Sequence, residues 1–155
     1  MCIRDSLCLL CTASAVPLPG YSEVSRFSEQ VRLTEVEGGV RMLDNAPSAL
    51  LPDRSTLVVF YATPNGNTLE QTLGRRPKSP DEWRFDIQHV AAQVRRLREV
   101  RPSENTVLVC LQAPGLSWPA WRGESADANA AIRRIVEQTL EGIPGEPKRV
   151  ALLGH

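Results

Sequence analysis

Three short runs of almost uninterrupted apolar residues limit the folds open to this chain more than any other feature. They span residues 56–62, 106–111 and 149–153. Runs of this length that are rich in β-branched and aromatic residues are typical of strands buried on both faces, as in parallel sheets covered by helices. We therefore expect three buried strands, the third of them ending at Leu153.

Two helical patterns separate these runs. Residues 79–82 (Ser-Pro-Asp-Glu) combine a capping serine, a proline at the first helical position and a glutamate that favours a helix start. A helix is expected from there until just before Pro102, and a second helix is expected from a cap at Ser125 to a stop at Gly142. The apolar stripes that predict them are Ile87, Val90, Ala91, Val94 and Leu97 in the first helix, and Ala128, Ala131, Ile132, Ile135, Val136 and Leu140 in the second.

A hairpin is expected ahead of these elements. Residues 31–37 alternate apolar and polar side chains, Gly38-Gly39 is a turn signal, and residues 40–43 form a second short run. Strands that alternate with helices call for parallel pairing with crossover connections. The predicted fold class is thus α/β, with a mostly parallel sheet, helices on both faces and an N-terminal β-hairpin.

The first fifteen residues are interpreted separately from the fold. Residues 1–6 resemble a translated sequencing adapter, and residues 7–15 resemble the end of a secretory signal peptide, with a small-x-small pattern at Ala13-Ser14-Ala15. A frayed apolar terminus is the alternative. We expect a secreted or periplasmic protein with no stable membrane span, because nine apolar residues are too few for a spanning helix. The expected organisation is residues 1–15 as artefact and residual signal, 16–30 as an extension, and 31–155 as a partial domain.

Composition excludes several classes of partner. Lysine plus arginine equal aspartate plus glutamate at 18 each, so no nucleic acid is expected as a partner. The arginines between residues 95 and 101 are interpreted as a solvated helix face. Of four cysteines, only Cys110 lies in the body of the chain, where a buried, inert thiol is expected. No metal site is expected, because the cysteines and the two histidines lack ligand spacing, and no cofactor is expected.

Ligands of such sheets bind beyond the carboxyl ends of the strands. The third run is followed there by Gly154-His155. In α/β-hydrolases a strand ends in Gly-x-Ser-x-Gly, which lifts the serine on a sharp turn. Together with the order of elements, Gly154 and His155 make residues 31–155 resemble the N-terminal half of the α/β-hydrolase family. The resemblance implies that the catalytic serine comes directly after His155, so that this chain by itself is inactive. An ordinary strand-end glycine is the alternative.

The resemblance also implies an oxyanion loop after the first run. Asn65, Gly66 and Asn67 are the expected backbone donors, in place of the family's common His-Gly form; a plain Asn-Gly turn is the alternative. A loop is expected over residues 112–124, and its Trp118 and Trp121 are candidate pocket walls, or else they close the core. Asp86 and His89 are interpreted as structural, or as supporting the site without contacting the substrate, because they lie within the first predicted helix and the family places its acid and histidine after the serine.

The predicted function is therefore that of a fragment of a secreted serine hydrolase, esterase- or lipase-like, acting on a small-molecule or polymeric ester. A serine peptidase of the same fold is the nearest alternative. A non-catalytic α/β scaffold or binding domain is an alternative from a different class. A nucleotide-binding domain is disfavoured, because residues 65–67 contain one glycine and no phosphate-binding fingerprint.

Overall fold

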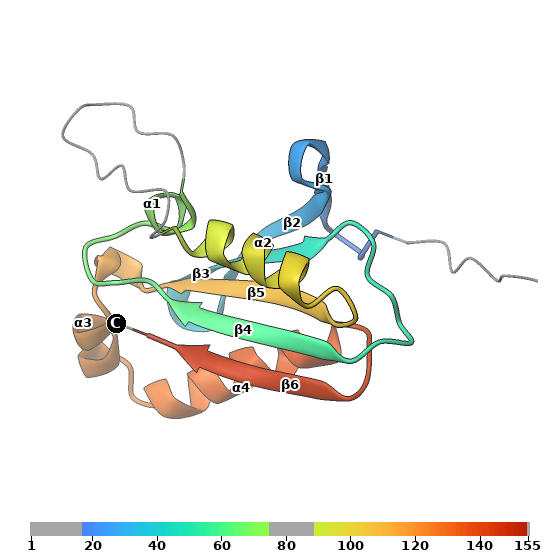
Figure 1. Cartoon of the computed structure of the whole chain (residues 1–155). Coiled ribbons are helices and arrows are strands. Elements are labelled where there is room, and N and C mark those ends of the chain that lie inside the picture. Colours follow the sequence, from blue (N-terminus) through green and yellow to red (C-terminus); the bar gives the residue numbers. More distant parts are fainter. Residues whose placement is uncertain (1–16, 75–88, 155) are drawn as a thin grey trace, which may run out of the picture.

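A computed structural model of the chain describes residues 17–74 and 89–154 (Figure 1). Its centre is a single six-stranded sheet with the strand order β1-β2-β3-β5-β4-β6. The strands are β1 (Ser22–Val24), β2 (Glu29–Val36), β3 (Val40–Pro47), β4 (Thr56–Ala62), β5 (Asn105–Gln112) and β6 (Lys148–Leu153). The helices longer than one 3₁₀ turn are α1 (Leu69–Leu73), α2 (Val90–Val100), α3 (Trp118–Glu124) and α4 (Ala128–Glu141).

The prediction of a mostly parallel sheet is wrong, because the sheet is mixed and mostly antiparallel. β1 pairs with β2, β2 with β3, and β3 with β5, and each of these pairs is antiparallel. Among the described strands, only the pairs β4–β5 and β4–β6 are parallel. Short connections between the three strands of residues 22–47 account for the pairs β1–β2 and β2–β3, because a short connection permits only antiparallel neighbours.

The N-terminal hairpin is formed by β2 and β3 and extends beyond the predicted residues. Its register runs from Glu29 opposite Pro47 to Val36 opposite Val40. Gly38, in the turn, has a φ of 73°, and a Cβ there would come within 2.9 Å of Trp121 Nε1. Glycine is therefore required at this position both by the backbone conformation and by the close approach of the Trp121 ring. β1 and the start of β2 fall within residues 17–30, so part of the expected extension belongs to the sheet.

β6 is an edge strand, which corrects the prediction of a third buried strand. Among the described strands it pairs with β4 alone. Val150, Leu152 and Leu153 are 44%, 71% and 50% exposed. By contrast, every residue of β5 is buried, because it lies between β3 and β4 in the middle of the sheet. An apolar run predicts a strand but not its place in the sheet.

Two apolar clusters lie on opposite sides of β4 and β5. Val58 and Phe60 of β4 belong to the cluster that contains Ile135 of α4 and Trp121 of α3. Val59, between them in sequence, belongs to the cluster that contains Leu69 of α1 together with Val90 and Val94 of α2. The alternation follows the two-residue period of a strand. Figure 1 shows α2 on one side of the sheet and α4 on the other.

The helix boundaries differ from the predicted ones. α2 begins at Val90, and His89 is its N-cap residue with an extended backbone, rather than a residue within the helix. The start signal at residues 79–82, together with Trp83, Asp86 and Ile87, lies outside the described residues. Asp127, not Ser125, is the N-cap residue of α4, and the predicted loop at residues 112–124 contains α3.

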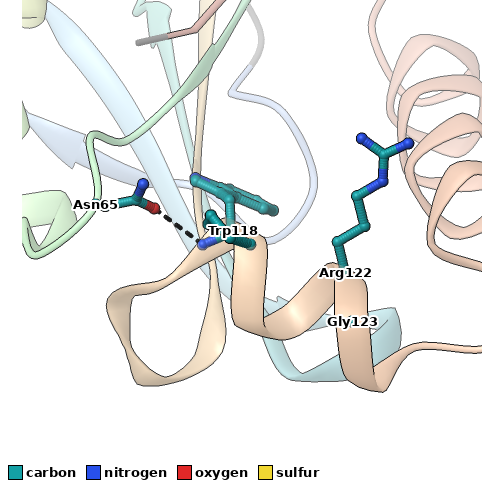
Figure 2. Close-up of a pocket in the computed structure, with 5 residues that line it drawn as sticks. Asn65, Trp118, Arg122 and Gly123 are labelled. Atoms are coloured by element: carbon teal, nitrogen blue, oxygen red, sulfur yellow. Dashed lines mark hydrogen bonds between the residues drawn. The ribbon is translucent and has the colours of Figure 1, made fainter.

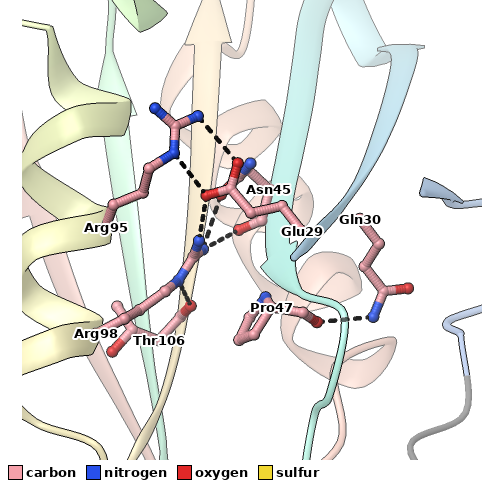
Figure 3. Close-up of polar contacts among 7 residues, drawn as sticks. All are labelled: Glu29, Gln30, Asn45, Pro47, Arg95, Arg98 and Thr106. Atoms are coloured by element: carbon pink, nitrogen blue, oxygen red, sulfur yellow. Dashed lines mark hydrogen bonds and ion pairs between the residues drawn. The ribbon is translucent and has the colours of Figure 1, made fainter. Parts of the chain in front are cut away.

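An ion-pair cluster connects α2 to β2 and β3 (Figure 3). Glu29 is 2% exposed and accepts hydrogen bonds from Arg95 Nε at 3.0 Å and Arg98 Nη1 at 2.6 Å. Arg98 also donates to the carbonyl oxygens of Asn45 and Thr106. The interpretation of the arginine run as a solvated face is therefore wrong for two of its members, whereas Arg96 is exposed and pairs with Glu99. Spacing along one helix could not show a buried carboxylate on a distant strand.

Cys110 is buried in the middle of β5, as expected. Burial raises the pKa of its thiol to about 12. The thiol is therefore protonated at neutral pH, which makes it a poor nucleophile.

Candidate functional site

The candidate site lies at the rim where the three parallel strands end. Tyr61 of β4 stands opposite Leu153 of β6, and Ala62 stands opposite Leu111 of β5. Gly154 follows directly, and a Cβ on it would lie 3.9 Å from the Ala62 Cβ. The two segments singled out from the sequence, residues 63–68 and Gly154, therefore leave neighbouring strands at the same rim (Figure 1). Since 3.9 Å is an ordinary contact distance, nothing in the described residues requires a glycine at position 154.

The segment after β4 forms a tight turn. The Asn67 N–H donates to the Pro64 carbonyl oxygen at 3.1 Å, and Gly66 lies inside this turn with a φ of 82°. The Gly66 N–H donates to the Leu116 carbonyl oxygen at 2.8 Å, which joins the turn to the segment after β5. A turn of this geometry needs glycine at its third position. The Asn-Gly pair is thus explained by the local backbone alone.

The hydrogen bonds of this turn bear on the expected oxyanion donors. The backbone N–H groups of Gly66 and Asn67 are both used within the protein. Within the described part of the chain, the Asn65 N–H has no such partner. Asn65 is therefore the member of the expected trio whose backbone donor remains for a ligand.

Asn65 and Trp118 connect this turn to α3 (Figure 2). The Asn65 side chain accepts a hydrogen bond through Oδ1 from the Trp118 backbone N–H at 3.0 Å. The Trp118 indole Nε1 donates to the Thr63 carbonyl oxygen at 2.9 Å. These two bonds, together with that between Gly66 and Leu116, hold the two rim segments in a fixed relative position. Because Oδ1 is engaged, the Asn65 Nδ2 is oriented as a donor.

A surface depression of about 510 Å³, open to solvent and called the cavity below, lies against this pair of segments. Its lining residues are Asn65, Trp118, Pro119, Arg122 and Gly123. Trp118 and Arg122 are four residues apart and therefore neighbours on one side of α3. Figure 2 shows Trp118 between Asn65 and Arg122, and the Arg122 side chain extends outward from α3.

The two candidate tryptophans have different environments. Trp118 lines the cavity, whereas Trp121 is buried in the core cluster beneath α3 and donates through Nε1 to the Gly38 carbonyl oxygen at 2.9 Å. Their rings meet edge to face, with centroids 5.7 Å apart. Trp121 thus supports the ring that lines the cavity, and edge-to-face contact is a favourable aromatic geometry.

The remaining candidates lie elsewhere or outside the described residues. His155, like Asp86, is outside them. His89 is buried at the start of α2, where a Cβ on Gly74 would come within 2.4 Å of its Nδ1. This contact places His89 against the end of α1 and not at the cavity, which agrees with a structural role.

A second polar cluster stands at the same rim. Arg41 of β3 donates to Glu70 of α1 at 2.9 Å and to Gln112 Oε1 at 3.1 Å. Gln112 Oε1 also accepts from the Leu69 N–H at 2.9 Å and so fixes the start of α1. The hydrogen bond from Arg41 lowers the pKa of Glu70. Because these groups satisfy one another, the cluster positions α1 beside the site.

No sequence pattern predicted Arg122, Pro119 or Gly123 as site residues. Treating residues 112–124 as a loop hid the helical spacing that places Arg122 one turn after Trp118. The proline that follows Trp118, with a capping serine before it, is a helix-start signal that could have revealed α3. The Ser117 side chain indeed accepts from the Ala120 N–H at 3.3 Å.

Comparisons with known proteins add no relative: no family model, curated protein or solved structure matches this chain. None of the described helices has the length and apolar character needed to cross a membrane. Within the same residues, no three histidine, cysteine or acidic side chains are grouped as metal ligands would be.

Proposed function

We propose that this chain is the N-terminal half of a secreted serine hydrolase that acts on acyl esters, with its nucleophile following His155. The observation that carries the proposal is the neighbouring position of Gly154 and Ala62 at the carboxyl ends of β6 and β4. A serine raised on a turn after Gly154 would stand beside the segment that begins at Thr63. That segment carries the unused N–H of Asn65 and borders a cavity.

The chemistry follows from that arrangement. The serine oxygen attacks the ester carbonyl carbon, and its proton passes to a histidine base supplied by the following part of the protein. The carbonyl oxygen becomes an oxyanion, to which the Asn65 N–H donates. The intermediate expels the alcohol and leaves an acyl-serine, which water then hydrolyses to the acid and free serine. Loss of a single oxyanion donor costs about 3 kcal/mol of transition-state stabilisation.

The test is an activity assay on the protein encoded by the uninterrupted reading frame. We expect a serine directly after His155 and hydrolysis of p-nitrophenyl butyrate. Alanine in place of that serine should abolish the hydrolysis without lowering the melting temperature. A different residue at that position, or a folded protein with no esterase activity, contradicts the proposal. A peptide p-nitroanilide tested in parallel distinguishes an esterase from a peptidase.

A non-catalytic binding domain is the second candidate. It is favoured by the hydrogen bonds that already occupy the Gly66 and Asn67 N–H groups, which leave Asn65 alone of the three expected backbone donors for a ligand. This candidate would be supported if the longer protein has no serine after His155 and still binds a ligand in the cavity.

A further inference from the structure

We propose that the cavity beside Asn65 binds a carboxylate carried on a flat apolar body, so that the hydrolase acts on esters with an anionic, aromatic-like portion. This inference rests on the proposed function for its link to catalysis. It concerns the binding of one part of the substrate, which can be measured without any turnover.

Arg122 supplies the charge. Among the described residues, its guanidinium makes no hydrogen bond or ion pair. The arginines of the hairpin and of α2, by comparison, have carboxylate partners: Arg32 pairs with Asp44, and Arg98 pairs with Glu29. An arginine that lines a cavity without a protein partner keeps its planar set of donors for a ligand. A guanidinium binds a carboxylate through two parallel hydrogen bonds.

The other polar group of the lining is also a donor. With Oδ1 accepting from the Trp118 N–H, the Asn65 Nδ2 presents N–H groups that have no partner in the described residues. No acidic side chain of residues 17–74 and 89–154 contributes to the lining. The polar side chains of this cavity therefore all donate hydrogen bonds. They favour a ligand group that only accepts hydrogen bonds, and a carboxylate is such a group.

The remaining lining residues are apolar, and the largest of them is Trp118, whose ring is flat. The Trp118 ring is held by its bond to Thr63 and by its contact with Trp121. Pro119 and Gly123 complete the lining. A planar ring can stack on such a surface with little loss of conformational freedom, because the surface is already fixed. Aromatic carboxylates combine this body with the required charge.

Binding of benzoate and of neutral benzamide to the 155-residue chain tests the inference, measured by ligand-observed NMR at low protein concentration. We expect benzoate to bind more tightly than benzamide. Arg122→Gln should weaken benzoate binding about fivefold, the effect of losing one partly exposed ion pair, and leave benzamide binding unchanged. Arg133→Gln is the matched control, because Arg133 is an exposed arginine of α4 outside the cavity.

Equal binding of the two probes, no binding of either, or equal effects of the two substitutions overturns the inference. Circular dichroism shows whether each variant is folded. Trp118→Phe retains an aromatic ring in the lining and keeps Arg122. It should therefore still bind benzoate more tightly than benzamide. If the probes bind as expected but the longer protein has no esterase activity, the proposed function fails and the carboxylate site stands.

Discussion

The guanidinium of Arg98 donates to the carboxylate of Glu29 across 2.6 Å, between α2 and the first residue of β2. The side chains of Glu29 and Arg98 are 2% and 15% exposed. Each charged group has therefore lost most of its contact with water and is stabilised by the other group instead. Replacing one member leaves the other charge buried, which costs more than the ion pair contributes when intact.

We therefore expect Glu29→Gln to lower the free energy of unfolding by about 3 kcal/mol, because Arg95 and Arg98 lose their shared counter-ion. Urea denaturation followed by circular dichroism measures the change. Glu99→Gln is the control: Glu99 is 64% exposed in its pair with Arg96, and its loss should change stability by less than about 0.5 kcal/mol. Similar effects of the two substitutions would contradict the account of the cluster.

Gly66 adopts a φ of 82°, with no atom within 4 Å of an added Cβ. Gly66→Ala should therefore destabilise the protein through backbone strain alone, by about 1 kcal/mol. Gly123, in α3, has equally open surroundings and no such φ, so Gly123→Ala should leave stability unchanged or raise it by up to about 1 kcal/mol. Thermal unfolding compares the pair, and a neutral Gly66→Ala would show that the turn is not fixed as described.

The exposed apolar residues of β6 predict poor solubility, because an unpaired apolar edge strand is a site for pairing between molecules. Leu152→Lys should raise the concentration at which light scattering appears. Val100→Lys provides the comparison, since Val100 is 55% exposed but lies at the end of α2 and not on a strand. An equal gain from both substitutions would mean that general surface hydrophobicity, and not the edge, limits solubility.

The raised pKa of Cys110 predicts slow alkylation of the folded protein. With a pKa of about 12, only about one thiol in 10,000 is ionised at pH 8. The thiolate fraction grows as the pH rises toward the pKa, and burial limits access throughout. Iodoacetamide treatment followed by peptide mass spectrometry should show Cys110 modified only after denaturation. Rapid labelling of native Cys110 at pH 8 would indicate that β5 opens readily.

Local patterns in the sequence predicted the elements better than their arrangement. The limits of β4 were predicted at Thr56 and Ala62, and the apolar stripe of α4 includes Ala131 and Ile135, because side-chain periodicity reports burial directly. The antiparallel pairing of β3 with β5 was missed, because it joins residues more than 60 positions apart. No local signal records such a contact.

The candidate site was predictable only in outline. The rule that parallel strands end at a common rim placed residues 63–68 and Gly154 together without any knowledge of their contacts. It could not show that the Gly66 and Asn67 N–H groups are already used, nor that Arg122 faces the same cavity as Trp118. These facts depend on how the segment after β5 folds against the turn after β4.

The account depends most on a reactive serine at the rim beside Ala62. Reaction of the protein from the uninterrupted reading frame with a fluorophosphonate, followed by peptide mass spectrometry, tests this directly. The account predicts one covalent adduct, on a serine that follows His155, and its loss when the protein is denatured before labelling. A natively folded protein that forms no adduct, or forms it at a serine elsewhere in the chain, would contradict the account.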